Sequence, residues 1–272
     1  MKRILVTGSS GFVGSGLVTL LESIQMPASR IDEEYFLHDN WKDHLLQLLD
    51  MHKPEFIFHI GACSDTLEQD SQFMMIRNYE STKLLVDWAA RNSAGVIYSS
   101  SAATYGENGL YPSNLYGWSK YAAEDYVRLN GGVSLRYFNV YGPGEKHKGR
   151  MASFFLQALI KKASGEEIKI FPKKPLRDFV YIKDILSANL YAMNDYHALA
   201  KGVFDVGSCQ PRSFEDGLRI LNIEFSYTEE SEIPKGYQFY TSGEVHKLMP
   251  GWKPEYSLEL GLADYTHIIG NE

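Results

Sequence analysis

Two residues four positions apart, Tyr116 and Lys120, are the strongest indication of chemistry in this chain. A tyrosine that has lost its proton can take up the hydroxyl proton of a carbinol while the carbinol hydrogen leaves as hydride. A lysine four residues further along a helix lies on the same face, where its positive charge favours the phenolate. Ser101 ends an apolar run upstream and could hydrogen-bond the same oxygen. These three residues predict alcohol oxidation with a nicotinamide cofactor, whose ribose Lys120 would also hold.

A glycine-rich segment near the start of the chain could bind the pyrophosphate of such a cofactor. It lies between an expected strand at 2–7 and an expected helix at 13–23, and glycine-rich turns in this position also occur for purely structural reasons. The first two glycines would permit a tight turn against main-chain N–H groups, and the third would let helix and strand pack closely. The expected cofactor-binding residues here are Gly8, Gly11, Phe12, Val13 and Gly14.

The acidic residue that usually holds the adenosine ribose is not evident in its usual place. It is expected about 20 residues beyond the glycines, at the end of a second strand. The segment 26–40 indicates instead that the second and third strands are shortened or fused. Asp32 is a candidate for the ribose, Arg30 for a 2′-phosphate, and Asp39 and Asn40 for contact with adenine. Solvated loop charges would explain each of them as well, so NADP and NAD both stay open.

Small residues follow the next expected strand, 55–60. At the carboxyl edge of a parallel sheet, small side chains let a cofactor pass, so Gly61, Ala62 and Cys63 are expected to contact it. We interpret Cys63 as a packing residue rather than a nucleophile. Asn78, on an expected helix at 73–91, could brace the active-site strand beside the cofactor, or cap or face solvent.

Apolar runs of β type alternate with helical patterns along the chain, which is typical of a parallel sheet with crossover helices. Further strands are expected at 96–99 and 133–137, and further helices at 118–130 and 151–162. We predict an α/β fold, a Rossmann-type doubly wound parallel sheet with a smaller C-terminal α/β substrate-binding lobe. The cofactor-binding domain is expected to span 1–143, with a return segment near 177–206, and 144–272 to form mainly the substrate-binding lobe.

Composition narrows the class of protein. A chain of 272 residues can bury the core of one Rossmann unit and a lobe, and a net charge of −7 argues against a general nucleic-acid binder. The two cysteines, Cys63 and Cys209, form no disulfide framework and fit a reducing cytoplasm. Glycines and serines interrupt the apolar residues after Lys2-Arg3, so we expect no signal peptide. We expect a cytoplasmic protein with no membrane span and no metal site.

Several longer motifs are more specific than the tyrosine and lysine pair. They are Ser100-Ser-Ala-Ala-Thr-Tyr-Gly106, Arg136-Tyr-Phe-Asn-Val-Tyr-Gly-Pro143, His147-Lys-Gly149, Met151-Ala-Ser153 and Arg177-Asp-Phe-Val-Tyr181. Together with Tyr116-Gly-Trp-Ser-Lys120, they resemble the ADP-L-glycero-D-manno-heptose 6-epimerase family of the extended short-chain dehydrogenases/reductases. The resemblance covers nearly the whole chain and is most specific between Arg136 and Ser153.

The resemblance implies a redox-neutral reaction on a nucleotide sugar. Bound NADP oxidises C6 of the heptose, the transient ketone presents its other face, and the same hydride returns. Tyr116 and Lys148 would take opposite proton roles, although a loop lysine is ordinarily a solvated side chain. Val140 would contact the cofactor, and Lys173 and Lys174 could assist with phosphate or be solvated. The implied substrate-binding residues are Ser64, Asn139, Ser153, Phe171, Arg177 and Tyr237. A homo-oligomer is expected by analogy with the family.

The chain departs from the family pattern in ways that leave the exact sugar open. Its segment between Gly106 and Tyr116 is short, and Arg150 and Gln157 stand where the family usually has a serine and a histidine. Another nucleotide-sugar epimerase or a 4-keto-sugar reductase would use the same serine, tyrosine and lysine.

Two other classes of protein fit the sequence less well. Ala102 and Ala103 follow the active-site serine where dehydratases and decarboxylases need acidic residues, so elimination chemistry is disfavoured. A cofactor-sensing protein on a Rossmann fold is the alternative that is not an enzyme. Loss of Tyr116 or Lys120 would have favoured it, and both are present.

Overall fold

A computed structural model describes residues 2–107, 109–234 and 237–270. The chain forms two compact units. The first contains the chain up to Arg136 together with Leu186–Phe204, and the second contains Tyr137–Ile185 and the chain from Asp205 onward. The sequence predicts a boundary at position 143, whereas the first unit ends at Arg136. The segment that returns to it, Leu186–Phe204, is shorter than the predicted 177–206.

A six-stranded sheet, in the order β10-β5-β4-β3-β1-β2, forms the centre of the first unit. Its strands are β1 (Ile4–Thr7), β2 (Ala28–Ile31), β3 (Phe56–His59), β4 (Gly95–Ser101), β5 (Val133–Tyr137) and β10 (Val203–Val206). β1 pairs in parallel with both β2 and β3, and β3 pairs in parallel with β4. Parallel neighbours need crossover connections, and helices supply them here. The predicted Rossmann-type α/β fold is confirmed.

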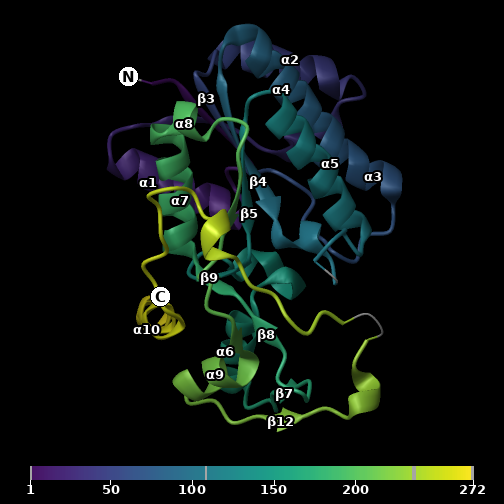
Figure 1. Ribbon diagram of the computed structural model, residues 1–272, viewed down its shortest axis with the longest axis vertical. Coiled ribbons are helices and arrows are strands. Elements are labelled where there is room, and N and C mark those ends of the chain that lie inside the picture. The colour runs from purple at the N-terminus through teal and green to yellow at the C-terminus, as the bar shows by residue number, and fades with distance from the viewer. Residues whose placement is uncertain (1, 108, 235–236, 271–272) are drawn as a thin grey trace. The chain divides into compact units, whose positions relative to one another are not determined.

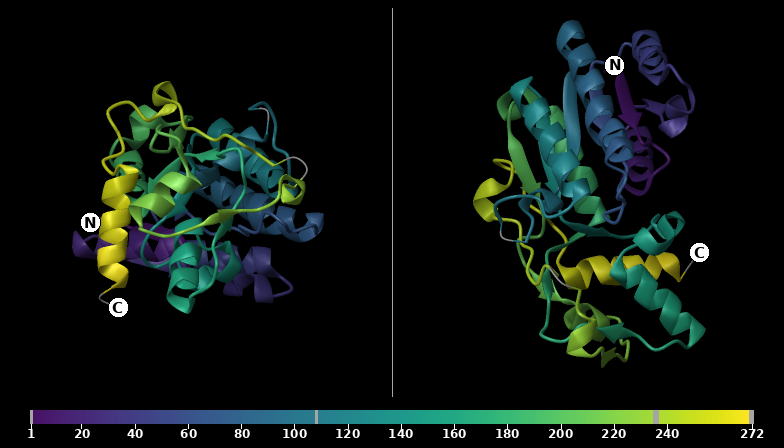
Figure 2. Two further views of the ribbon diagram at one scale, coloured as in Figure 1. Left: turned by 90° about the horizontal axis from the view of Figure 1, so that it is seen from below. Right: turned by 90° about the vertical axis from the view of Figure 1, so that its right-hand side faces the viewer.

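Helices cover both faces of this sheet (Figures 1 and 2). One face carries α2 (Trp41–His52), α4 (Ser81–Asn92) and α5 (Leu115–Leu129), and the other α1 (Phe12–Ser23), α7 (Ile182–Asn194) and α8 (Tyr196–Leu199). Because successive side chains of a strand point to opposite faces, Leu5 packs under the first group of helices and Ile4 and Val6 point the other way. Leu49 and Trp88 are in the same buried cluster as Leu5. The apolar runs are therefore explained by burial on both faces.

The long helix predicted at 73–91 is three consecutive pieces. A short α3 (Ser71–Met75) leads into a π-helical turn, η2 (Ile76–Glu80), and then into α4. Two 3₁₀ turns, η1 (Glu33–Leu37) and η3 (Ala102–Tyr105), follow β2 and β4. The π turn places one extra residue in the helical path and contains Asn78.

Helix α5 begins earlier than the sequence predicts. Asn114 caps it by accepting a hydrogen bond from the Gly117 N–H at 2.7 Å, so helical structure starts at Leu115 rather than at Trp118. As a result Tyr116 lies in the first turn of α5 and Lys120 in the second.

The edge strand β2 corrects one expectation from the sequence. It is a separate strand that pairs with β1 from Ile4↔Ala28 to Thr7↔Ile31, and the described residues 32–40 contain no further strand. The predicted shortening is therefore present. The expected absence of an acidic residue at the strand end is wrong, because Asp32 directly follows β2.

The glycine-rich turn between β1 and α1 is packed too closely for side chains. Gly8 has a left-handed φ of 66°, and a Cβ there would lie 2.5 Å from the Cα of Gly61. A Cβ on Gly14 would lie 1.9 Å from the Gly8 carbonyl oxygen. Both contacts are shorter than carbon and oxygen atoms tolerate, so the turn requires glycine at these positions.

The second unit is built from three small two-stranded sheets and flanking helices. β6 (Asn139–Tyr141) pairs with β9 (Phe179–Tyr181), β8 (Leu176–Arg177) with β11 (Arg212–Ser213), and β7 (Lys169–Ile170) with β12 (Ser226–Tyr227). The helices are α6 (Phe154–Ser164), α9 (Phe214–Ile220) and α10 (Leu258–Ile269), with 3₁₀ turns η4 (Lys146–Met151), η5 (Glu230–Glu232) and η6 (Val245–Lys247). Aromatic rings fill its core, among them Tyr141, Phe155 and Tyr181.

Helix α6 begins later than predicted. Ser153 caps it by accepting from the Leu156 N–H, so Met151 belongs to the preceding 3₁₀ turn rather than to the helix. Within the described part of the chain, no helix has the length and apolar character needed to cross a bilayer.

We predict that Gly14→Ala lowers the free energy of unfolding by about 1–3 kcal/mol, because the new methyl forces the Gly8 turn away from α1. Gly16→Ala is the matched control on the same helix. Its Cβ would meet only side-chain carbons of Leu186, at 3.3–3.4 Å, and we expect a smaller change. Urea unfolding of both variants measures the difference, and equal midpoints would contradict this account of the turn.

Candidate active site

The three residues that the sequence predicts for catalysis lie at one edge of the first unit. Ser101 is the last residue of β4, and its hydroxyl accepts from the Ala103 N–H at 3.1 Å. The Ser101 side chain also lies close to Tyr116, in the first turn of α5. Burial raises the pKa of the Tyr116 phenol, and the nearby Ser101 side chain opposes that rise. The structure thus brings the two residues together, as the sequence predicts.

Lys120 lies one turn further along α5 and is almost fully buried. Its ammonium donates to the Ser99 carbonyl at 2.7 Å and lies 4.7 Å above the centre of the Tyr98 ring. Burial lowers the pKa of Lys120 to about 7, with Cys63 and Glu124 acting in the opposite direction. The sequence predicts that this lysine acidifies Tyr116. In the structure burial dominates the pKa of Tyr116, so the predicted lowering is not found.

Asn78 connects the loop after β3 to helix α5. Its side chain is buried, accepts from the Cys63 N–H at 2.8 Å, and donates to the Cys63 carbonyl at 3.0 Å and the Ser119 hydroxyl at 2.9 Å. Ser119 stands between Tyr116 and Lys120 on α5. Asn78 therefore braces the loop after β3 against α5 rather than the active-site strand itself, and its burial excludes the solvent-exposed alternative.

A buried histidine that no motif in the sequence indicates extends this network. Thr82 Oγ1 donates its only proton to the Asn78 carbonyl at 2.6 Å, so the 2.8 Å contact with His59 requires that His59 Nε2 donates. His59 Nδ1 then accepts from Thr7 Oγ1 at 2.7 Å, which in turn accepts from the Gly61 N–H at 3.2 Å. Burial lowers the pKa of His59 to about 3, so the ring is neutral.

A buried ion pair lies behind the catalytic strand. Arg136 holds Glu124 through both carboxylate oxygens, at 2.8 and 2.6 Å, and the Ser100 hydroxyl donates to the same carboxylate at 2.6 Å. The Arg136 guanidinium also lies 4.5 Å above the Tyr105 ring. Because Ser100 precedes Ser101 and Glu124 follows Lys120 by one turn, this pair fixes both sides of the site. A single sequence shows no sign of it, since Glu124 reads as one more helical surface residue.

The turn between β1 and α1 fits a dinucleotide. Gly8, Gly11, Phe12, Val13 and Gly14 form the turn and the start of α1, as predicted, and no side chain among the described residues caps that helix end. Main-chain N–H groups at a helix start favour a phosphate. Gly61 packs against Gly8, and the loop continues through exposed Ala62 and half-buried Cys63. Burial raises the pKa of the Cys63 thiol, which agrees with the interpretation of Cys63 as a packing residue.

Asp32 lies against the same turn. Its carboxylate accepts from the Ser9 hydroxyl at 2.7 Å and from the Ser10 N–H at 2.9 Å. Arg30, the candidate for a 2′-phosphate, is instead paired with Glu22 across the protein surface. Asp39 and Asn40 are exposed between η1 and α2, and no contact of theirs tests the predicted proximity to adenine.

Lys148 lies in the second unit, in the 3₁₀ turn η4. It is half-buried, and burial lowers the pKa of its ammonium while the nearby Glu145 opposes that change. Gly149 follows with φ 53° and ψ −121°, a kink inside the turn. Lys148 is thus not the fully solvated lysine that such a loop ordinarily contains.

Three predicted ligand-binding residues lie around β6 and α6. The Asn139 amide donates to the Asp178 carbonyl at 3.0 Å and to Thr241 at 3.2 Å, and the half-buried Val140 follows it. Ser153 donates to the Glu145 carboxylate at 2.7 Å and also caps α6. The hydroxyl of Ser153 therefore has a structural role, and its contact with substrate stays a prediction. Ser64, in the first unit, is exposed.

Arg177 lies among aromatic rings in the second unit. Its guanidinium is 5.1 Å from the centre of the Tyr237 ring and 5.7 Å from that of Phe214, and Phe171 packs edge-on against Tyr237 at 5.0 Å. Burial lowers the pKa of Arg177. Among the described residues no carboxylate pairs with it. The structure therefore brings together three predicted substrate-binding residues: Tyr237 lies against the Arg177 guanidinium, and Phe171 packs against Tyr237.

The two lysines considered as helpers of Arg177 are engaged elsewhere. Lys173 pairs with Glu230 at 2.7 Å, and Lys174 lies 3.9 Å from the buried carboxylate of Glu215. These contacts favour the interpretation of both as ordinary surface lysines.

Asp178, next to Arg177, is a buried anchor that the sequence did not single out. Its carboxylate accepts from the N–H groups of Ser208, Cys209 and Gly243 and from the Ser208 hydroxyl, at 2.6–3.0 Å. Burial raises the pKa of Asp178, and these hydrogen bonds oppose the rise. The Arg177-Asp-Phe-Val-Tyr181 motif thus places a buried structural carboxylate next to the half-buried Arg177.

A carbinol hydrogen-bonded by Ser101 and Tyr116 would lie at the same sheet edge as the glycine turn, where the nicotinamide of a dinucleotide is expected. That arrangement defines a short-chain dehydrogenase/reductase with a nicotinamide cofactor. The chain belongs to the NAD dependent epimerase/dehydratase family, whose model matches residues 4–207.

Known proteins resemble the chain over nearly its whole length. It is 33% identical to an ADP-L-glycero-D-manno-heptose-6-epimerase of Brachyspira hyodysenteriae, over 98% of this chain and 97% of that one. It is 36% identical to the enzyme of that name from Cupriavidus pinatubonensis, over 78% and 75%. The crystal structure of the Helicobacter pylori ADP-L-glycero-D-manno-heptose-6-epimerase matches with a TM-score of 0.85 at 30% identity, covering 100% of this chain and 97% of that one.

These findings confirm the resemblance that the motifs indicate. At the level of the family and its relatives, they also confirm the expected class of enzyme, an NAD(P)-dependent sugar-nucleotide epimerase.

We predict that Asn78→Asp destabilises the first unit by about 3 kcal/mol or more. The substitution keeps the shape but replaces the donor that faces the Cys63 carbonyl with a buried anion. Asn92→Asp is the control, because Asn92 makes a similar amide contact with the Trp88 carbonyl on the exposed end of α4. Thermal unfolding distinguishes them, and a similar small loss in both variants would show that Asn78 is not a brace.

Proposed function

We propose that the protein is a nucleotide-sugar epimerase that inverts C6 of an ADP-heptose by transient oxidation and re-reduction. The observation that carries the proposal is the close pair of Ser101 and Tyr116 with buried Lys120 one turn away, in a chain similar over 98% of its length to a named heptose epimerase. Each element serves a reaction in which a carbinol loses its hydroxyl proton and the hydrogen on its carbon leaves as hydride.

The oxidation half-reaction uses the first unit. Tyr116, in its phenolate form, takes the C6 hydroxyl proton, with Ser101 bonded to the same oxygen, while the C6–H bond breaks and its electron pair leaves as hydride. A bound nicotinamide dinucleotide supplies reversible hydride acceptance, so no net oxidation remains after a full turnover. Because Lys120 has a pKa of about 7 and is held by Ser99, it can pass between charged and neutral forms near neutral pH.

The return half-reaction needs a proton donor for the inverted centre. We assign it to Lys148, because a half-buried ammonium with a lowered pKa gives up its proton more readily than a solvated one. Hydride returns to the opposite face of the C6 ketone and a proton adds to its oxygen. Tyr116 and Lys148 then exchange acid and base roles between the two directions of reaction.

We assign recognition of the substrate diphosphate to Arg177. A planar guanidinium matches two phosphate oxygens, and this one is half-buried, surrounded by aromatic rings and without a carboxylate partner in the described part of the chain. Phe171 and Tyr237 provide ring faces and a phenol beside it for the rest of the sugar nucleotide.

We further propose that the protein is cytoplasmic and forms a homo-oligomer. Its two cysteines are free, which suits a reducing compartment. The oligomer is inferred from the family alone, and light scattering of the purified protein measures it directly.

We predict that Tyr116→Phe abolishes epimerisation while the cofactor stays bound, because only the phenolic oxygen is removed. NMR of ADP-D-glycero-D-manno-heptose incubated with the protein would follow both C6 epimers. Wild-type protein should give a mixture of epimers with no net cofactor reduction. Wild-type turnover by Tyr116→Phe would refute the mechanism.

Lys148→Ala is the second arm of that experiment. It should block inversion while leaving cofactor affinity unchanged, since Lys148 exchanges its proton with the sugar oxygen and not with the cofactor. Unaltered epimerisation by this variant would reduce Lys148 to a loop charge. Absence of conversion by wild-type protein that binds a nicotinamide cofactor would point to another sugar nucleotide or to a net reductase.

The position of Asp32 leads us to propose NAD, rather than the NADP implied by the resemblance, as the preferred cofactor. A carboxylate at the end of β2 can accept hydrogen bonds from ribose hydroxyls, whereas a 2′-phosphate there would meet a like charge. Arg30, which could offset that charge, is paired with Glu22.

We predict that Asp32→Ala reduces the preference for NAD over NADP, measured as the ratio of their affinities, roughly tenfold. Such a change corresponds to a loss of about 1.4 kcal/mol in the binding free-energy difference between the two cofactors. Arg30→Ala is the matched control and should leave the ratio nearly unchanged. Titration of protein fluorescence with each cofactor measures both. Tighter binding of NADP by the wild-type protein would overturn the proposal.

A further inference from the structure

One buried carboxylate closes the segment that carries Lys148. The segment runs from Gly142, just after β6, to Ser153, just before α6. The side chain of Glu145 accepts from the Gly142 N–H at 3.1 Å and from both the N–H and the hydroxyl of Ser153. Because both ends of the segment bind the same side chain, residues 142–153 form a ring whose closure depends on Glu145.

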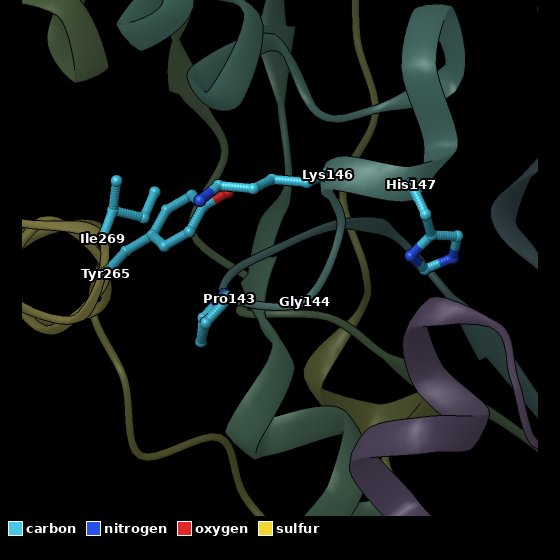
Figure 3. Close-up of a pocket in the computed structure, with 6 residues that line it drawn as sticks. All are labelled: Pro143, Gly144, Lys146, His147, Tyr265 and Ile269. Atoms are coloured by element: carbon cyan, nitrogen blue, oxygen red, sulfur yellow. The ribbon is translucent and has the colours of Figure 1, made fainter. Parts of the chain in front are cut away.

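A third element binds the same carboxylate. The hydroxyl of Tyr265, on α10, donates to Glu145 Oε1 at 2.8 Å. A cavity of about 230 Å³ lies beside this contact. Figure 3 shows the side chain of Lys146 extending there toward Tyr265 and Ile269, while His147 points away from them. The ring is thus attached to a helix more than one hundred residues later in the sequence.

The environment of Glu145 is unusual for an acidic residue. The side chain has 0% exposure, and its hydrogen bonds in the described structure all come from main-chain N–H groups and hydroxyls, none from a cation. Burying a carboxylate is costly unless its oxygens are fully hydrogen-bonded, and an ionised carboxylate offers acceptors only. Four donors aimed at two oxygens meet that requirement, so the arrangement is specific for a carboxylate.

Glu145 also acts directly on the neighbourhood of Lys148. Its carbonyl accepts from the Lys148 N–H at 3.0 Å, which fixes the turn η4 at its start. Its side-chain charge is the one that offsets the effect of burial on the Lys148 ammonium. The kink at Gly149 then returns the chain to Ser153, where the ring closes.

We propose that Glu145 is the positioning residue for Lys148, holding the ring 142–153 closed and supplying the local negative charge that keeps the Lys148 ammonium ready to donate its proton. The consequence for turnover rests on the proposed function of Lys148. The structural part, that Glu145 sets the position and charge state of Lys148, is independent of that proposed function.

Other charged and titratable groups of this region could contribute to the same readout. Lys146, His147 and Arg150 share the segment with Lys148, and Tyr265 faces it from α10. Glu145 is the charged group that favours the ammonium form of Lys148 against the effect of burial. Removing its charge should therefore shift the titration of Lys148 in one direction, toward lower pH.

The test is Glu145→Gln, with two measurements on the full-length protein. Acetylation by acetic anhydride across a pH series, read at each lysine by mass spectrometry, gives the titration of Lys148, with exposed Lys161 on α6 as internal reference. The Lys148 profile should move to lower pH while that of Lys161 stays. Epimerisation should fall on the order of 10- to 100-fold in kcat, the cost of a misplaced reacting group, with little change in KM.

Tyr265→Phe is the matched control, because it removes one hydrogen bond but keeps the charge. It should lower kcat only a few-fold and leave the Lys148 acetylation profile in place. An unchanged Lys148 profile in Glu145→Gln would overturn the proposal. A shifted profile together with full activity of Lys148→Ala would retain the positioning role and instead refute the catalytic role of Lys148.

A folding defect in Glu145→Gln would still leave the idea testable. Tyr265→Phe and Ser153→Ala each remove donors to the intact carboxylate and should each reduce kcat a few-fold. Wild-type kcat in both variants would show that closure of the ring does not position Lys148.

Discussion

The first unit depends on a directed chain of hydrogen bonds that starts at the Gly61 N–H and passes through Thr7, His59 and Thr82 to the Asn78 carbonyl. Its direction is fixed because Thr82 has one proton to give and His59 is neutral. The chain joins the ends of β1 and β3 to the π turn. Gly61, whose N–H starts this chain of bonds, is also the residue that lies closest to Gly8 at the dinucleotide turn.

In the second unit, buried carboxylates hold the loops in place. Asp178 and Glu145 are both fully buried, and both are satisfied by main-chain N–H groups and hydroxyls. Each lies next to a residue with a proposed function, Asp178 beside Arg177 and Glu145 near Lys148. Short two-stranded sheets offer few ladder hydrogen bonds, so the loops between them are fixed by hydrogen bonds to these buried carboxylates.

Much of the first unit could be predicted from local signals. Alternating apolar runs gave the parallel sheet, and the spacing of Tyr116 and Lys120 gave the catalytic pair. The second strand was harder to assign because Ala28–Ile31 is short, lies at the sheet edge and is largely not buried, which removes the apolar signal of a strand. Asp32 therefore looked like a loop charge, although the strand before it places its carboxylate at the glycine turn.

Long-range polar contacts could not be predicted at all. Glu145 meets Tyr265 across 120 positions, and Asn78 meets Ser119 across 41, and neither pairing leaves a trace in local composition. The neighbouring lysine also predicts a lowered pKa for Tyr116, whereas burial, which the sequence does not show, raises it. Motifs identify which residues react, whereas the groups that hold them are found only in three dimensions.

The π turn between α3 and α4 makes the site sensitive to helix length. Each residue of a helix advances the direction of the side chain by about 100°. The extra residue in Ile76–Glu80 therefore sets how the helix before it is rotated relative to the helix after it. Met74 before the turn, Asn78 within it and Thr82 after it are all buried. Deleting a single residue here would preserve every motif in the chain and yet turn Asn78 away from Cys63, so segment length carries information that residue identity does not.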